Sequence, residues 1–187
     1  MATIHSTTLA PTKLELLTGW LPLQPWYRAG GTAPRLERAG GFRLDDPAGE
    51  VGIELMVVTD GAGAGTAYFT PLTYRGAPLE EAAAGLIGTL EHGVLGTRWV
   101  YDAAHDPVAQ AQLLAFVTGG VEAQHQSESD TLDPSVGRTW DGGAGGTVEL
   151  VRVPQSGAAV PDARGTVELG WTRPDGSTAR GVVAVVR

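Results

Sequence analysis

The sequence contains no cysteine. This absence excludes disulfide bonds, thiolate metal sites, iron–sulfur clusters and cysteine nucleophiles. It fits a reducing cytoplasm, where we expect the protein to be located. A chain of 187 residues buries enough surface to fold without a disulfide or a metal.

Asparagine is also absent, and Lys13 is the only lysine. The 27 glycines and abundant alanine, valine and arginine indicate a GC-rich genome, in which AT-rich codons are rare. The bias still has a chemical consequence, because any mechanism that requires an asparagine metal ligand is excluded.

Clusters of positive charge are missing. The net charge is −8 and the arginines are scattered, so nucleic acid and anionic membranes are poor partners. The N-terminus has no basic run followed by an apolar stretch, so we expect no signal peptide. No apolar run approaches the roughly 18–20 residues that span a bilayer.

Apolar and β-branched stretches separated by turn sequences predict an α+β fold with a mainly antiparallel, curved and possibly barrel-like sheet. Hairpin patterns cover 42–74 and 86–101, and a third ends the chain around the Asp-Gly turn at 173–177. The glycine-containing segment 26–41 predicts a loop, and 75–85 is ambiguous. Further strands are expected at 3–9, 121–126 and 147–153.

Two helices are predicted. Residues 107–118 form the main one, because Asp106 can cap it, Pro107 suits its first position and an apolar stripe follows. Residues 12–20 show helical spacing of apolar side chains, and the prolines that follow end this shorter helix.

The densest group of polar and aromatic side chains lies at 90–107. Arg98 and Asp102 share one face of a strand and are able to pair, and His92 beside Glu91 suggests an acid/base pair. These four residues are the candidate catalytic groups. The alternative is structural: a hairpin tip, an aromatic core contact and a helix cap.

The sequence gives little support for a metal site, a phosphate-binding loop or a cofactor. The histidines His5, His92, His105 and His125 lack metal-ligand spacing, so no metal site is predicted. The glycine runs at 61–65 and 142–146 lack the lysine and following helix of a phosphate loop, and they are interpreted as hairpin linkers. No cofactor is expected.

Aromatic side chains are the candidate binding groups. Trp26 and Tyr27, in a segment stiffened by prolines, suit sugar stacking or a protein interface, although packing against the sheet is the other use. Trp99, Tyr101 and Arg75 complete the set of candidate ligand- or partner-binding residues.

Four motifs resemble the maltokinase N-terminal cap domain, in particular the stand-alone cap-like proteins of actinobacteria. They are WLPLQPWYRAGG at 20–31, PLTYRG at 71–76, GTLEHG at 88–93 and RWVYDAAHDPVAQAQLL at 98–114. The resemblance covers about residues 12–118. It implies that this part corresponds to a cap that, in the full kinase, sits on an aminoglycoside-phosphotransferase-like unit phosphorylating maltose with ATP and magnesium.

The sequence departs from a kinase where catalysis would begin. Such enzymes need a lysine on the ATP phosphates, a catalytic aspartate and metal ligands. The segment TVELVRVP at 147–154 has no lysine, Lys13 falls in the cap-like helix, and no H-G-D-type loop is present. We expect residues 1–187 to form a single domain in which 119–187 extends the sheet of 1–118.

The leading hypothesis is therefore a non-catalytic accessory or regulatory module in glucan or trehalose metabolism. It would bind a protein partner, a kinase or glucan-metabolism enzyme, or a small molecule. The first alternative is a ligand carrier whose curved sheet encloses a cavity lined by Trp99, Tyr101 and Trp171. The second is an enzyme that uses Glu91, His92, Arg98 and Asp102. The oligomeric state is left open.

Overall fold

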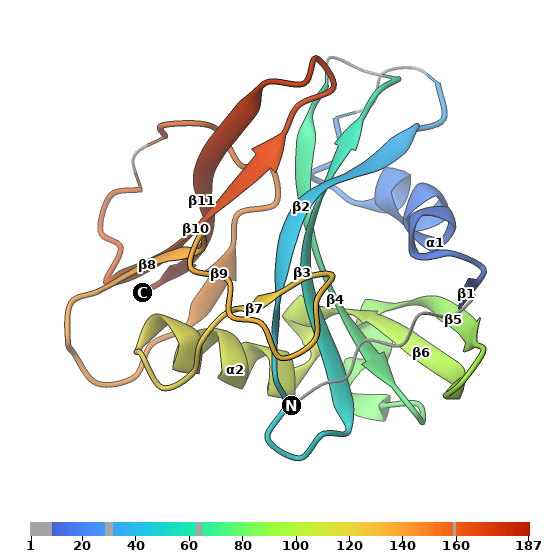
Figure 1. Ribbon diagram of the computed structural model, residues 1–187, viewed down its shortest axis with the longest axis horizontal. Helices are drawn as coiled ribbons and strands as arrows, with labels where there is room; N and C mark the ends of the chain where they lie inside the picture. The colour runs from blue at the N-terminus through green and yellow to red at the C-terminus, as the bar shows by residue number, and fades with distance from the viewer. Residues whose placement is uncertain (1–8, 29–31, 63–64, 159) are drawn as a thin grey trace.

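The computed structural model of the protein describes residues 9–28, 32–62, 65–158 and 160–187. Within these residues, seven strands form sheet A in the order β1-β5-β6-β4-β3-β2-β7, and four form sheet B in the order β8-β10-β11-β9. All pairings are antiparallel, which confirms the predicted α+β class with a mainly antiparallel sheet. Sheet A is a curled half-barrel that ends at β1 and β7 (Figure 1). Its strands are β1 Leu9–Ala10, β2 Leu36–Leu44, β3 Val51–Asp60, β4 Ala67–Arg75, β5 Leu86–His92, β6 Gly96–Asp102 and β7 Gln124–His125.

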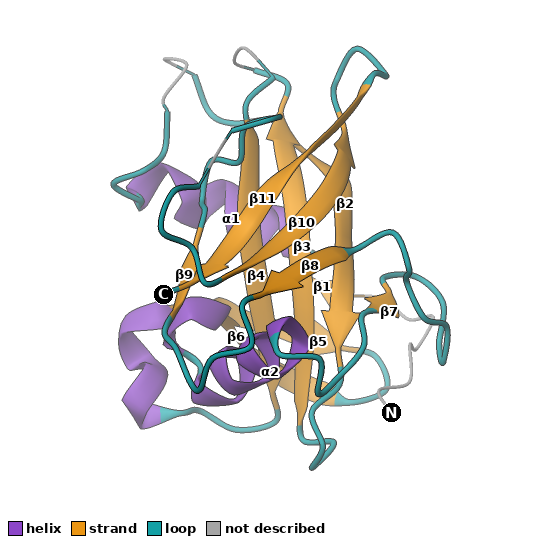
Figure 2. Ribbon diagram, turned by 90° about the vertical axis from the view of Figure 1, so that its left-hand side faces the viewer, coloured by secondary structure: helices purple, strands orange, loops and turns teal. Residues whose placement is uncertain are grey.

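Sheet B lies against one face of sheet A, with β10 and β11 crossing over β2, β3 and β4 (Figure 2). Its strands are β8 Gly137–Trp140, β9 Val148–Leu150, β10 Gly165–Thr172 and β11 Thr178–Val186. The C-terminal part was predicted to extend the first sheet, but only β7 does so. The remainder forms a second layer, because its apolar side chains cover the face of sheet A instead of continuing its edge.

Both predicted helices are present. Helix α2, Pro107–Val117, begins at Pro107 and is capped by Asp106, whose carboxylate accepts a hydrogen bond from the Val108 amide at 3.0 Å. Helix α1, Lys13–Trp20, begins with a capping box in which Thr12 and Glu15 bond each other's backbone amides. Three short 3-10 helices complete the described secondary structure: η1 Leu21–Leu23, η2 Glu80–Gly85 and η3 Ala103–His105. The ambiguous segment 75–85 is thus resolved in part as η2.

Two hydrophobic cores cover the two faces of sheet A. Along β3, Ile53, Leu55 and Val57 point into the core shared with sheet B and α2, whereas Met56 and Val58 point into the core beneath α1 and η1. Alternation along one strand therefore supplies both cores, as expected where each face of a sheet is covered.

The predicted loop at 26–41 is wrong in its second half, since β2 begins at Leu36. The glycines that suggested a loop have another use. A Cβ atom at Gly40 would lie 2.6 Å from the Gly170 carbonyl oxygen, so the small residue allows β2 and β10 to approach each other. No helix among the described residues is long and apolar enough to cross a membrane.

Candidate functional site

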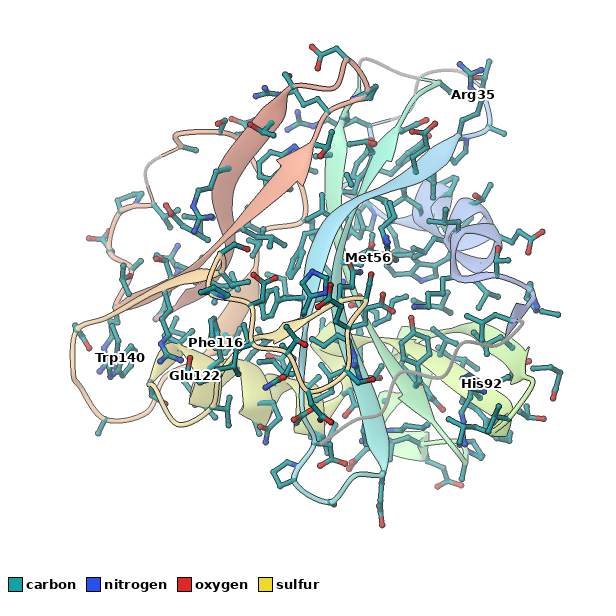
Figure 3. The ribbon with its side chains drawn as sticks, in the orientation of Figure 1. Arg35, Met56, His92, Phe116, Glu122 and Trp140 are labelled. Atoms are coloured by element: carbon teal, nitrogen blue, oxygen red, sulfur yellow. The ribbon has the colours of Figure 1, made fainter. Side chains whose placement is uncertain are left out.

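The β5–β6 hairpin contains the predicted catalytic cluster. His92 Nδ1 accepts hydrogen bonds from the Val94 and Leu95 amides at 3.3 and 3.1 Å, and Arg98 Nη2 donates to the Leu95 carbonyl at 2.8 Å. Glu91 accepts a bond from the Thr97 hydroxyl at 2.7 Å. His92 lies at the outer edge of the molecule (Figure 3). These contacts build a hairpin tip, as in the structural alternative.

The structure does not bring the four candidate catalytic groups together. Glu91 and His92 are successive residues of a strand, so their side chains leave opposite faces of the sheet. Arg98 and Asp102 share a face of β6, but four residues of extended strand separate them by about 13 Å. Asp102 instead binds Arg152 at 2.5 Å, so the predicted Arg98–Asp102 pair is a wrong prediction.

Arg75 is held by a partner within the protein. Its guanidinium donates two hydrogen bonds of 2.7 Å to the fully buried carboxylate of Asp106, the α2 cap. Burial alone would raise the pKa of Asp106, but the bonds from Arg75 and the Val108 amide outweigh it and lower that pKa. Arg75 thus positions the start of α2.

Tyr101 and Trp99 lie on the strand that pairs with the end of β4. The Tyr101 hydroxyl accepts a hydrogen bond from the Leu79 amide at 2.8 Å, which holds the chain just before η2, and Trp99 stands opposite Arg75 in the strand register. Trp171 belongs to the core between the two sheets. Of the three aromatic residues predicted to line a carrier cavity, Trp171 therefore lies in a core that does not include Trp99 or Tyr101.

Trp26 and Tyr27 pack against the α1 face of sheet A. The Trp26 ring lies 5.8 Å from Trp20 and 6.1 Å from Tyr68, and the Tyr27 hydroxyl donates a 3.3 Å hydrogen bond to Asp60. The Arg152 guanidinium lies over Trp26 at 5.2 Å from the ring centre. Packing against the sheet, the second of the two predicted uses, accounts for these contacts.

A buried carboxylate in β3 forms the polar centre beneath α1. Glu54 accepts hydrogen bonds of 2.6 Å from both Lys13 Nζ and the Tyr74 hydroxyl, and one of 2.9 Å from Gln126. Burial disfavours ionisation, but the charge of Lys13 and these bonds outweigh it and lower the pKa of Glu54. Burial and the neighbouring carboxylate raise the pKa of Tyr74 well above its ordinary value.

Glu54 lies on the face of β3 opposite Ile53 and Leu55, and it was not among the predicted site residues. A single acid within an apolar strand is the signal that could have marked it. Arg152 had no comparable signal, because its partners are 50 and 126 positions away in the sequence. Among the described residues, no group of three or more His, Asp or Glu side chains is placed to hold a metal; His5 and most of the expected strand 3–9 lie outside them.

The fold and these contacts define a two-layer antiparallel α+β domain whose buried charges connect its structural elements. Residues 20–106 match the family model of the maltokinase N-terminal cap domain. The match runs from the end of α1 to the Asp106 cap, and it confirms the family resemblance over that segment. No curated protein sequence matches the chain.

Proposed function

We propose that this protein is a non-catalytic accessory module of the maltokinase-cap type that binds a protein partner through the tip of the β5–β6 hairpin. The observation that carries the proposal is the pair Val94 and Leu95, whose exposed fractions are 62% and 45%. The hairpin lies inside the segment that matches the cap family.

The tip suits a binding role because its backbone is held in place. The bonds from His92 and Arg98 fix the Val94–Leu95 turn before any partner arrives. A preorganised loop loses less conformational entropy on binding, so its apolar side chains contribute more to affinity.

The proposal gives this chain no phosphotransfer role. The contacts of its only lysine support this part of the proposal. Lys13, the only lysine, bonds Glu54 and lies 5.4 Å from the centre of the Tyr74 ring. It is therefore engaged beneath α1 and not available for ATP phosphates, and the sequence has no asparagine for a magnesium site.

The family context suggests the partner. A maltokinase cap accompanies a sugar-phosphorylating unit, so the proposed partner is a kinase or another enzyme of glucan or trehalose metabolism in the cytoplasm. The carrier alternative loses support because Phe42, Leu113 and Phe116, each at most 2% exposed, fill the space between sheet A and α2.

The test compares three versions of the full-length protein: wild type, Val94→Ser/Leu95→Ser and Leu132→Ser. Leu132 is 58% exposed and lies outside the hairpin, so it is the matched control. Each is titrated calorimetrically against a purified maltokinase or glucan-processing enzyme of the same organism. We expect binding by the wild type and the control and at least tenfold weaker binding by the hairpin variant. Equal affinities of all three, or ATP-dependent sugar phosphorylation by this chain alone, would refute the proposal.

A further inference from the structure

An open cleft of about 360 Å³ lies where the ends of sheets A and B meet. Its lining comes from the start of β4 with Arg28, from the segment 153–156, and from Trp171 and Arg173 at the end of β10. A Cβ atom added at Gly65, which precedes β4, would lie 3.3 Å from the Pro174 ring in the β10–β11 turn, which is drawn uppermost in Figure 1.

The lining of this cleft is positively charged. It includes two guanidinium groups, from Arg28 and Arg173, and no carboxylate, although the whole chain carries a net charge of −8. In the described part of the chain, the Arg28 side chain has no ion-pair partner. Arg173 donates to the Ser177 hydroxyl and the Thr178 carbonyl, both at 3.2 Å. The nearby Asp175 carboxylate accepts bonds from Ser177 at 2.6 and 2.9 Å.

Neutral hydrogen-bonding groups complete the lining. Thr66 brings a hydroxyl group and Gln155 brings a side-chain amide to the cleft. Hydroxyl and amide donors next to guanidinium groups are the combination that recognises phosphate and carboxylate oxygens in proteins.

The wall at 153–156 is fixed to sheet B. A Cβ atom at Gly181 would lie 2.5 Å from the Gln155 carbonyl oxygen, so this glycine lets the wall rest directly on β11. The Ser156 hydroxyl donates to the Arg180 carbonyl at 3.1 Å, and Pro154 is buried. The 153–156 part of the lining is therefore formed by backbone that is held in place against sheet B.

We propose that this cleft binds a small organic anion through Arg28 and Arg173, with a phosphate or carboxylate group as its recognised part. The volume admits a small metabolite and not a folded partner. The site is separate from the β5–β6 hairpin and does not depend on the partner-binding proposal.

The test is calorimetric titration of the full-length protein with three probes: inorganic phosphate, glycerol 3-phosphate and acetate. Arg28→Gln and Arg173→Gln each remove one charge from the cleft. Arg38→Gln removes the same charge from an exposed arginine of β2 outside the lining, and near-ultraviolet circular dichroism checks that each variant is folded.

We expect glycerol 3-phosphate to bind, Arg28→Gln to weaken it about tenfold or more, and Arg38→Gln to leave it unchanged. Binding of the two phosphate probes alone would identify the phosphate group as the part that the cleft recognises, whereas acetate binding with the same Arg28 dependence would include carboxylates. Absence of binding by all three probes would overturn the proposal. Equal weakening by Arg28→Gln and Arg38→Gln would overturn it as well, because it would show a diffuse effect of net charge.

Discussion

Arg152 and Asp102 form a 2.5 Å ion pair that joins the C-terminal third of the chain to the end of β6. The side chains are 14% and 5% exposed, and the guanidinium also lies over the Trp26 ring. This pair connects the cap-like segment to residues outside the family match.

Replacement of Arg152 by alanine should destabilise the protein by about 3 kcal/mol, because it leaves the Asp102 charge buried without its cation. Arg164→Ala is the matched control. Arg164 also pairs with an aspartate, Asp141, and stacks on a tryptophan, but its pair is 33% and 47% exposed. The control should cost less than about 1 kcal/mol. Urea unfolding measures both values, and equal losses would contradict this account of the pair.

Lys13→Met tests the buried centre at Glu54. Without the ammonium group, burial should dominate and raise the pKa of Glu54, so the variant should lose about 1–3 kcal/mol at pH 7. The loss should shrink toward pH 4.5, as protonation removes the unpaired charge, and Lys13→Met/Glu54→Gln should recover much of it. Urea unfolding at both pH values is the measurement, and a loss independent of pH would argue against an ionised Glu54.

The wild-type protein should lose stability in acid. Glu54 and Asp106 have pKa values in the folded state below their ordinary values of 4.5 and 3.8. The unfolded state therefore binds protons first as the pH falls, and the stabilisation is complete above these values and is lost below them. We expect a nearly constant unfolding free energy from pH 7 to about 5.5 and a steady decrease below about 4.5. Increasing stability over the lower range would contradict the assignment.

Gly40→Ala should destabilise the contact between the two sheets. Its added methyl group would meet the Gly170 carbonyl oxygen at 2.6 Å, and such overpacking costs about 1–3 kcal/mol. Gly19→Ala in α1 is the control, because no atom lies within 4 Å of the new Cβ, and it should stabilise the helix by up to about 1 kcal/mol. Thermal unfolding of the two variants should move in opposite directions. A neutral Gly40→Ala would indicate that the sheets can separate slightly.

Local features of the fold were predictable from the sequence. The Asp106–Pro107 start of α2 and the hairpins around β3, β4, β5 and β6 rest on neighbouring residues, and the structure contains them. The second sheet was not predictable in this way, because its strands look the same whether they extend one sheet or cover its face. The role of Gly40 was not predictable from neighbouring residues either, because the strand that approaches it, β10, lies far along the chain.

In the candidate site, too, contacts between adjacent residues were predictable from the sequence and contacts between distant residues were not. The hairpin alternative for Glu91, His92 and Arg98 came from adjacent residues and agrees with the contacts of the tip. Arg152, the partner of Asp102, could not be predicted from adjacent residues, because it lies beyond α2 in the sequence. The cleft at Arg28 and Arg173 had no sequence signal, because its walls come from four separate segments.

Part of one edge of β4 is covered by the C-terminal third of the chain. Strand β6 pairs with β4 only from Leu72 to Arg75. Closer to the start of β4, the Phe69 amide donates instead to the Arg152 carbonyl at 2.9 Å. A protein cut after α2 would leave that edge uncovered, and an uncovered edge recruits strands from other molecules. The segment that matches the family model therefore shares this edge of β4 with the C-terminal third of the chain, and a fragment limited to residues 20–106 would leave the edge uncovered.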